Sequence, residues 1–259
     1  MGGRSLASSI ILVHPSGSRR IQSLMPQDLS GKVAVVTGGT RGIGRAIAER
    51  LLTERAAVAL CGVSNANVEK ARAELADYGN RVMAEVADIG KLDDVRRFFH
   101  AVDERLGTVD FLINNAGIGI YKPVVDLDPA EWHRMINLNL NGVYYCSHEA
   151  LQRMRGRGGY IINVSSLAGK NAFAGGAGYN ATKFGVNGFS EAMMMDCRYD
   201  GVRVSYIMPG SVATDFGKSG PADWKIAPED IADVVMTMLH MPERTLISRI
   251  EMRPSKPKK

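Results

Sequence analysis

Short runs of β-branched and other apolar residues alternate with longer segments of helical periodicity from Gly31 almost to the C-terminus. The runs predict strands over Lys32–Thr37, Ala57–Gly62, Arg81–Ala87, Val109–Ile113, Tyr160–Ser165, Val202–Met208 and Thr245–Met252. The segments between them predict helices over Gly42–Thr53, Asn65–Tyr78, Leu92–Leu106, Pro129–Arg155, Gly178–Tyr199 and Pro228–His240. This alternation is typical of parallel strands joined by crossover helices. We therefore expect an α/β protein with a doubly wound, seven-stranded parallel sheet and helices on both of its faces.

The chain has 259 residues, of which 45% are hydrophobic and 23% are charged, as is typical of a globular protein. Residues 29–254 are predicted to form one domain. Residues 1–28 have a composition that faintly resembles a transit peptide, but we expect a disordered extension or an upstream start, with Met25 as the alternative first residue. Residues 255–259 form a basic tail. The longest apolar runs are far shorter than the roughly 20 residues of a membrane-spanning helix, so no membrane partner is expected.

The positive charge is concentrated at the two ends of the chain. Residues 1–25 carry three arginines and no acid, and residues 254–259 carry three lysines and no acid. The two ends therefore contribute +6 to the net charge of +5, so the formal charges of residues 26–253 sum to −1. The body of the protein therefore has no net attraction for a polyanion, and no nucleic-acid partner is expected.

The three cysteines, Cys61, Cys146 and Cys197, lack C-x-x-C spacing, and no pair of histidines shows H-E-x-x-H spacing. Neither a disulfide framework nor a metal site is predicted. This use of cysteine favours a reducing compartment, and we expect the cytoplasm.

A glycine-rich turn joins the first predicted strand to the first predicted helix. Its sequence, Thr37-Gly-Gly-Thr-Arg-Gly-Ile-Gly44, has the spacing T-G-x-x-x-G-x-G. Glycines at such a turn let the backbone approach a diphosphate, and the N-terminus of the following helix offers unpaired N–H donors and the positive end of its dipole. The position of this turn predicts a dinucleotide site in a Rossmann fold.

The end of the second predicted strand, Cys61-Gly-Val-Ser64, bears on the choice of dinucleotide. A carboxylate in this region would hydrogen-bond the adenosine ribose of NAD, but no Asp or Glu is present. Arg41 in the glycine turn could pair with a 2′-phosphate. NADP(H) is therefore favoured, and NAD(H) stays possible because Val63 stands where a second basic residue would help.

Tyr179 and Lys183 lie four residues apart in a predicted helix, on the same face. An ammonium beside a phenol favours the phenolate and is expected to bring the phenol pKa toward neutrality, where proton exchange is efficient. Tyr-x-x-x-Lys is a weak signal by itself, so its weight comes from its occurrence together with the other motifs.

Taken together, the motifs resemble those of the short-chain dehydrogenase/reductase family over about residues 30–252. Besides the glycine turn they are Asp88, Asn114-Asn-Ala-Gly117, Asn139, Ser166, Tyr179-x-x-x-Lys183, and Pro209-Gly210 with Thr214. The resemblance implies that Tyr179 is the general acid/base and that Ser166, rather than its neighbour Ser165, hydrogen-bonds the substrate oxygen. It also implies that Lys183 binds the nicotinamide ribose and that Asn139 holds a water molecule connecting Lys183 to solvent.

The resemblance further implies which residues bind the cofactor. These are Thr37, Gly38, Thr40, Arg41, Gly42, Ile43, Gly44, Asp88, Ile89, Asn115, Ala116, Gly117, Tyr179, Lys183, Pro209, Gly210, Val212 and Thr214.

The resemblance implies an oxidoreductase that moves a hydride between NADPH and a carbonyl compound or secondary alcohol. The body is most similar to 3-oxoacyl-acyl-carrier-protein reductases, whereas the C-terminal strand looks more like that of dehydrogenases of small hydroxy acids; a non-catalytic dinucleotide sensor is a further alternative. The partners implied are a small-molecule carbonyl or alcohol substrate and other copies of the chain in a homotetramer or dimer. Phe173, Tyr206, Phe216 and Trp224 are candidates either for the substrate site or for packing.

Overall fold

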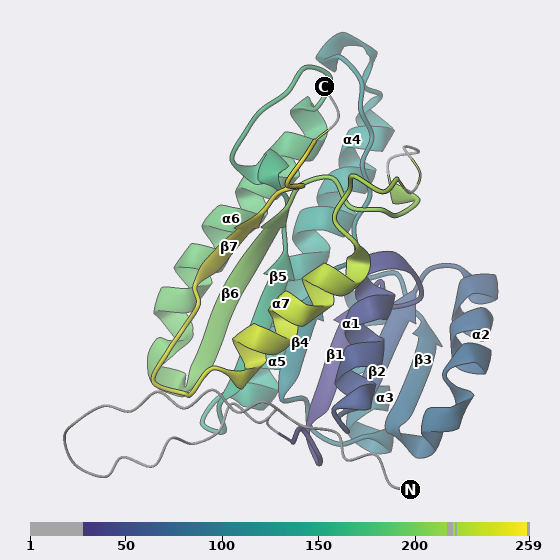
Figure 1. Cartoon of the computed structure of the whole chain (residues 1–259), viewed down its shortest axis with the longest axis vertical. Helices are drawn as coiled ribbons and strands as arrows, with labels where there is room; N and C mark the ends of the chain where they lie inside the picture. The colour runs from purple at the N-terminus through teal and green to yellow at the C-terminus, as the bar shows by residue number, and fades with distance from the viewer. Residues whose placement is uncertain (1–27, 217–219, 221, 258–259) are drawn as a thin grey trace, which may run out of the picture.

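Seven strands form one parallel sheet in the order β3-β2-β1-β4-β5-β6-β7 in the computed structural model, which describes residues 28–216, 220 and 222–257 (Figure 1). The strands are β1 (Val33–Thr37), β2 (Ala57–Gly62), β3 (Val82–Val86), β4 (Phe111–Asn114), β5 (Gly159–Val164), β6 (Val202–Pro209) and β7 (Arg249–Met252). The predicted fold class is confirmed. The expected disorder of the N-terminal extension falls outside the described residues, as do the last two residues of the basic tail.

The helices are α1 (Gly42–Thr53), α2 (Asn65–Glu74), α3 (Leu92–Arg105), α4 (Pro129–Ile136), α5 (Gly142–Met154), α6 (Ala177–Cys197) and α7 (Pro228–His240). Side chains alternate between two cores along the strands. In β1, Ala34 and Val36 pack with α1, α2 and α7 on one face of the sheet, whereas Val33 and Val35 pack with α3, α5 and α6 on the other. Every residue of β1 is buried, which is expected when helices cover both faces of a parallel sheet.

The order of the strands reverses at β1. The chain proceeds outward from β1 through β2 to β3 and then returns to place β4 on the other side of β1. The segments that follow β1 and β4 therefore leave the sheet in opposite directions. A crevice at this switch point is where open α/β sheets bind ligands.

Three predicted elements differ from the structure by more than two residues at an end or by a division. The helix predicted over Pro129–Arg155 is divided by a π-helical turn, Asn137–Asn141, between α4 and α5. The helix predicted to continue to Tyr78 ends at Glu74, and Gly79 then adopts a left-handed φ of 62°. The last strand begins at Arg249 instead of Thr245, because the Thr245 amide bonds back to the Pro242 carbonyl in a turn.

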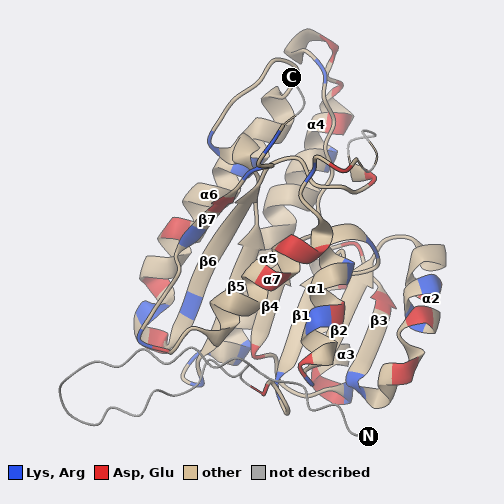
Figure 2. Cartoon of the chain, in the orientation of Figure 1, with Lys and Arg blue, Asp and Glu red and all other residues tan. Residues whose placement is uncertain are grey.

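Charged side chains lie mainly on the outer faces of the helices. Figure 2 shows basic and acidic residues interspersed along α1 and α2. Arg45 pairs with Glu49 in α1, and Lys70 pairs with Glu74 in α2. None of the described helices has both the length and the apolar character needed to cross a bilayer.

Leu112 tests the packing at the centre of the sheet. Its side chain in β4 is completely buried. Leu112→Ala is expected to lower the free energy of unfolding by about 2–5 kcal/mol, because it removes apolar contacts and leaves a cavity. Leu246→Ala, at a partly exposed position, is the matched control and is expected to change it by about 0.5 kcal/mol or less. Chemical denaturation measures both, and equal effects would contradict the assigned core.

Candidate active site

A cavity of about 1160 Å³ opens at the carboxyl edge of the sheet, at the switch point between β1 and β4. Its wall is formed by segments that follow each of the seven strands and by the start of α6. Most of the predicted site residues line it, namely Gly38, Thr40, Arg41, Gly42, Ile43, Ile89, Asn115, Ala116, Gly117, Ser166, Tyr179, Lys183, Pro209, Gly210, Val212 and Thr214. The cavity is larger than the 300–1,000 Å³ typical of drug-sized ligands, so it has room for a dinucleotide.

The glycine turn has the properties of a diphosphate cradle. Gly38 has a φ of +64°, and a Cβ there would lie 2.9 Å from the Ala116 Cα. A Cβ on Gly44 would lie 2.5 Å from the Gly38 carbonyl oxygen. The first turn of α1 has no side-chain cap and no acidic residue, so its N–H groups and positive dipole end face the turn. The residues present therefore fit the predicted dinucleotide.

Thr37 and Gly44 shape the turn from behind the cavity wall. The buried Thr37 hydroxyl oxygen accepts hydrogen bonds from the amides of Asn115 (3.0 Å) and Ala116 (3.1 Å). The Asn115 side-chain amide in turn donates to the carbonyls of Thr37 and Gly38. These bonds hold the loop after β4 against the glycine turn.

The outer end of the cavity is bordered by Arg41 and by the segment between β2 and α2. Val63 lies in the segment after β2, where the sequence has no acidic residue, and its side chain is 65% exposed. Ser64 caps α2 by accepting a hydrogen bond from the Asn67 amide, and both residues line the cavity. Among the described residues, no carboxylate forms an ion pair with Arg41. Ile89 lines the cavity, whereas Asp88 lies behind it and accepts a hydrogen bond from the Gly90 amide.

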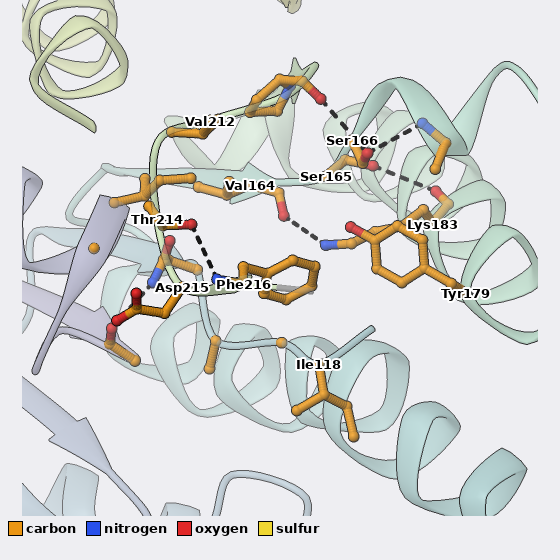
Figure 3. Close-up of a pocket in the computed structure, with 18 of the residues that line it drawn as sticks. Ile118, Val164, Ser165, Ser166, Tyr179, Lys183, Val212, Thr214, Asp215 and Phe216 are labelled. Carbon is orange, nitrogen blue, oxygen red and sulfur yellow. Dashed lines mark hydrogen bonds between the residues drawn. The ribbon is translucent and has the colours of Figure 1, made fainter. Parts of the chain in front are cut away.

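The two serines that follow β5 differ in what they contact. The Ser165 hydroxyl donates to the Asn187 side chain at 2.5 Å and is also 3.4 Å from the Lys183 carbonyl, so it is committed to α6. The Ser166 hydroxyl accepts from the Ala168 amide at 3.1 Å and is 3.5 Å from the Pro209 carbonyl (Figure 3). Ser166 is therefore the serine whose hydroxyl is placed to contact a ligand beside Tyr179.

Tyr179 and Lys183 enter the cavity from the first turns of α6, near Ser166 (Figure 3). Both side chains are buried. The Lys183 ammonium donates to the Val164 carbonyl at 2.9 Å and lies 5.8 Å from the centre of the Tyr179 ring.

The charge states of this pair differ from the sequence-based expectation. Burial raises the pKa of Tyr179 well above its ordinary value, and the hydrogen bond with Ser166 offsets only part of that rise. The expectation that Lys183 brings this pKa toward neutrality is therefore wrong for the arrangement seen here, because the low-polarity surroundings dominate. Burial also lowers the pKa of Lys183 to about 8. At neutral pH the phenol is protonated and the lysine is charged.

Asn139 is a predicted site residue that does not line the cavity. It is buried in the π-helical turn, a feature frequent at functional sites. Its side chain accepts from the Ile118 amide (2.9 Å) and donates to the Ile118 carbonyl (2.8 Å) and to the Thr182 hydroxyl (3.2 Å). It thereby joins the loop after β4 to α6, and its water-holding role stays a prediction.

Several lining residues were not predicted from the sequence. Ser64 and Asn67 could have been found from the helix-capping serine before α2. Tyr121 and the C-terminal residues Arg253, Pro254 and Pro257 carry no comparable signal. Of the aromatic candidates, Phe173, Phe216 and Trp224 line the cavity, whereas Tyr206 is buried elsewhere and donates its hydroxyl to Glu191.

Comparisons with known proteins agree with this geometry. Residues 32–224 match the family model described as short chain dehydrogenase. The chain is 34% identical to the 3beta-hydroxysteroid dehydrogenase 2 of Eggerthella lenta over 73% of this chain and 74% of that protein. It is also 34% identical to the 3-oxoacyl-acyl-carrier-protein reductase FabG of Vibrio harveyi over 85% of this chain and 94% of that protein.

A solved structure, the alcohol dehydrogenase of the archaeon Thermococcus sibiricus complexed with 5-hydroxy-NADP, superposes with a TM-score of 0.81 at 32% identity. The match covers 88% of this chain and 99% of that one. The fold, the site and these similarities together show that the chain belongs to the short-chain dehydrogenase family and is an NAD(P)-dependent oxidoreductase acting on CH–OH groups.

Proposed function

We propose that this protein is an NADP(H)-dependent reductase of ketones, which in the reverse direction oxidises secondary alcohols. The observation that carries the proposal is that the buried Tyr179 lies one helical turn before Lys183 and near Ser166, and that all three line the cavity (Figure 3). This cluster stands at the inner end of a cavity whose other end is formed by Arg41 and the start of α2.

The protein's own part in the reaction is to hold the carbonyl and deliver a proton. When bound, NADPH would supply the hydride from C4 of its nicotinamide. Ser166 donates a hydrogen bond to the carbonyl oxygen, where negative charge develops. Tyr179 donates its phenolic proton to the same oxygen. A phenol kept neutral by burial is suited to this role, because it remains protonated until the oxygen becomes basic.

The cofactor-binding roles follow from the placement of the wall residues. The amides of the glycine turn and the start of α1 would hold the diphosphate, with Thr37, Gly44 and Asp88 supporting these segments from behind. Lys183 would bind the nicotinamide ribose. The segment Pro209–Thr214, which lies across the glycine turn with Thr214 near Gly42, would border the nicotinamide.

Arg41, with Ser64 and Asn67 opposite, supports a preference for NADP(H) over NAD(H). A guanidinium and hydrogen-bonding groups at the N-terminus of a helix suit a phosphate. No acid among the described residues of this wall would repel that phosphate, since the single lining carboxylate is Asp215, after β6.

A second candidate function, a dehydrogenase of small hydroxy acids, is favoured by one observation. Arg253 lines the cavity beside Pro254, and its guanidinium could pair with a substrate carboxylate. The same guanidinium lies 3.2 Å from Glu251, so part of its charge is already neutralised. We therefore rank this candidate second.

We also propose a single catalytic domain that assembles with copies of itself in the cytoplasm. Tyr144 of α5 and Phe184 and Met195 of α6 are exposed apolar side chains on neighbouring helices, which supports assembly through this face. The three cysteines are free and buried, which supports a reducing compartment.

Tyr179→Phe tests the assigned acid. The substitution removes the proton donor and keeps the ring, so turnover in NADPH-dependent ketone reduction should fall at least about 10²-fold. The dissociation constant for NADPH, measured by fluorescence titration, should stay nearly unchanged. Tyr199→Phe is the matched control, because Tyr199 is 93% exposed. Turnover unchanged by Tyr179→Phe would contradict the mechanism.

Arg41→Ala tests the cofactor preference. Loss of a charge-assisted contact to the 2′-phosphate should raise the dissociation constant for NADPH by about 10- to 100-fold. The constant for NADH should change little, because NADH lacks that phosphate. Arg97→Ala, in an exposed position on α3, controls for the loss of a positive charge. An equal effect on both cofactors would contradict the assigned role of Arg41.

A further inference from the structure

Three aromatic rings surround the proposed proton donor. The Tyr121 ring meets the Tyr179 ring edge-on, with centres 5.5 Å apart and an interplanar angle of 89°. Phe216 lies 5.9 Å from Tyr179 (Figure 3), and Phe173 lies 5.6 Å from Tyr121. We call Tyr121, Phe173 and Phe216 the aromatic collar. The collar comes from the loops after β4, β5 and β6, so side chains from distant parts of the chain pack on the Tyr179 ring or on its neighbour Tyr121.

The collar rings are more exposed than structural packing requires. Tyr121, Phe173 and Phe216 are 43%, 46% and 40% exposed, and all three line the cavity. Ile118, Leu167 and Trp224 extend the same wall. Apolar surface that converges on a reaction centre is the usual recognition surface for an apolar ligand.

The backbone under the collar is shaped to let the rings approach. A Cβ on Gly119 would lie 2.5 Å from the Tyr121 hydroxyl oxygen and 3.1 Å from the Phe216 ring. A Cβ on Gly176 would lie 2.6 Å from the Phe173 ring. A side chain at either position would displace the collar rings, so their placement depends on glycine at both positions.

Charged groups near the collar do not favour an anionic substrate. Lys183 is committed to the Val164 carbonyl. The other charged residues that line this part of the cavity, among those described, are Arg253 and Asp215. Arg253 is paired with Glu251, which is also held at 2.5 Å by Lys170. A substrate carboxylate would have to compete with Glu251 for Arg253 and would be repelled by Asp215.

We infer that the carbonyl substrate is an uncharged, rigid ring compound, alicyclic or aromatic, whose rings lie against the cavity-facing surface of Tyr121 and Phe216 while its oxygen meets Tyr179 and Ser166. The inference rests on the proposed function and names its substrate class. Rings lose little conformational freedom on binding and match the flat faces of the collar. Tyr121 and Phe216 then act as specificity-determining residues.

Three related ketones test this inference with the full-length protein and NADPH. They are cyclohexanone, 4-cyclohexylcyclohexanone and 4-oxocyclohexanecarboxylate, which share the reacting ring. The added apolar ring should raise kcat/KM at least about 10-fold over cyclohexanone, because more apolar surface is buried in the collar. The carboxylate should lower kcat/KM below that of cyclohexanone.

Variants then assign the effect to the collar. Phe216→Ala and Tyr121→Ala should each lower the ratio of kcat/KM for 4-cyclohexylcyclohexanone to that for cyclohexanone by at least about fivefold, mainly through KM. The kcat/KM for cyclohexanone itself should fall less. Tyr121→Phe keeps the ring and should preserve the preference. Tyr199→Ala, which removes an exposed aromatic ring from another part of the surface, is the matched control. Thermal unfolding checks that each variant is folded.

The outcomes separate this inference from the proposed function. Turnover of the carboxylate at least equal to that of the bicyclic ketone, or a ring preference unchanged by Phe216→Ala and Tyr121→Ala, would overturn the inference and leave the reductase in place. Loss of the carboxylate turnover in Arg253→Met would then identify the hydroxy-acid alternative. Failure to reduce any ketone while NADPH binds would overturn the proposed function itself, and the inference with it.

Discussion

The Thr37 hydroxyl ties together the two loops that separate at the centre of the sheet. It accepts hydrogen bonds from the amides of Asn115 and Ala116, so the loop after β4 is fixed against the end of β1. Parallel strands end at the same edge, but the chain turns away from β1 in opposite directions on its two sides, which opens the cavity. The cavity therefore exists because of the strand order, and hydrogen bonds of the Thr37 hydroxyl and the Asn115 side chain hold the loop after β4 against the glycine turn.

Burial controls the chemistry at the other end of the cavity. Burial excludes water from Tyr179 and raises its pKa, so the phenol stays protonated. Burial also lowers the pKa of Lys183. The Val164 carbonyl compensates the lysine in part by accepting its hydrogen bond. Asn139 fixes the geometry of this region, because its side chain forms hydrogen bonds with the loop after β4 and with α6, the helix that carries Tyr179 and Lys183.

The sequence was sufficient to predict the sheet and the strand ends that carry most of the candidate site residues, because both follow from local patterns. The glycine turn, Ser166 and Gly210 follow the ends of β1, β5 and β6 within two residues. Residues that follow parallel strands must gather at one edge of the sheet. The collar could not be predicted in this way. Tyr121 reaches Tyr179 through an irregular loop, and no periodic signal describes the path of such a loop.

The spacing of Tyr179 and Lys183 predicted their proximity but not their ionisation. Four residues on a helix place two side chains on one face, whereas the direction of a pKa shift depends on everything that surrounds them. Here the Lys183 ammonium points to a backbone carbonyl, and desolvation is the larger effect on both groups. The π-helical turn at Asn139 was missed for a related reason, because its sequence continues a helical pattern without interruption.

In the proposed mechanism the neutral phenol of Tyr179 donates a proton beside the buried Lys183, which loses its charge at moderately high pH. The pH dependence of kcat/KM for NADPH in ketone reduction measures this most directly, because it reports ionisations of the free enzyme. The pKa of Lys183 is lowered to about 8, so its charged form exists below that pH and disappears above it. We expect kcat/KM to fall as the pH rises through about 8, with no loss from Tyr179 ionisation in that range. A profile that stays level to pH 10, or that rises with pH, would contradict the account.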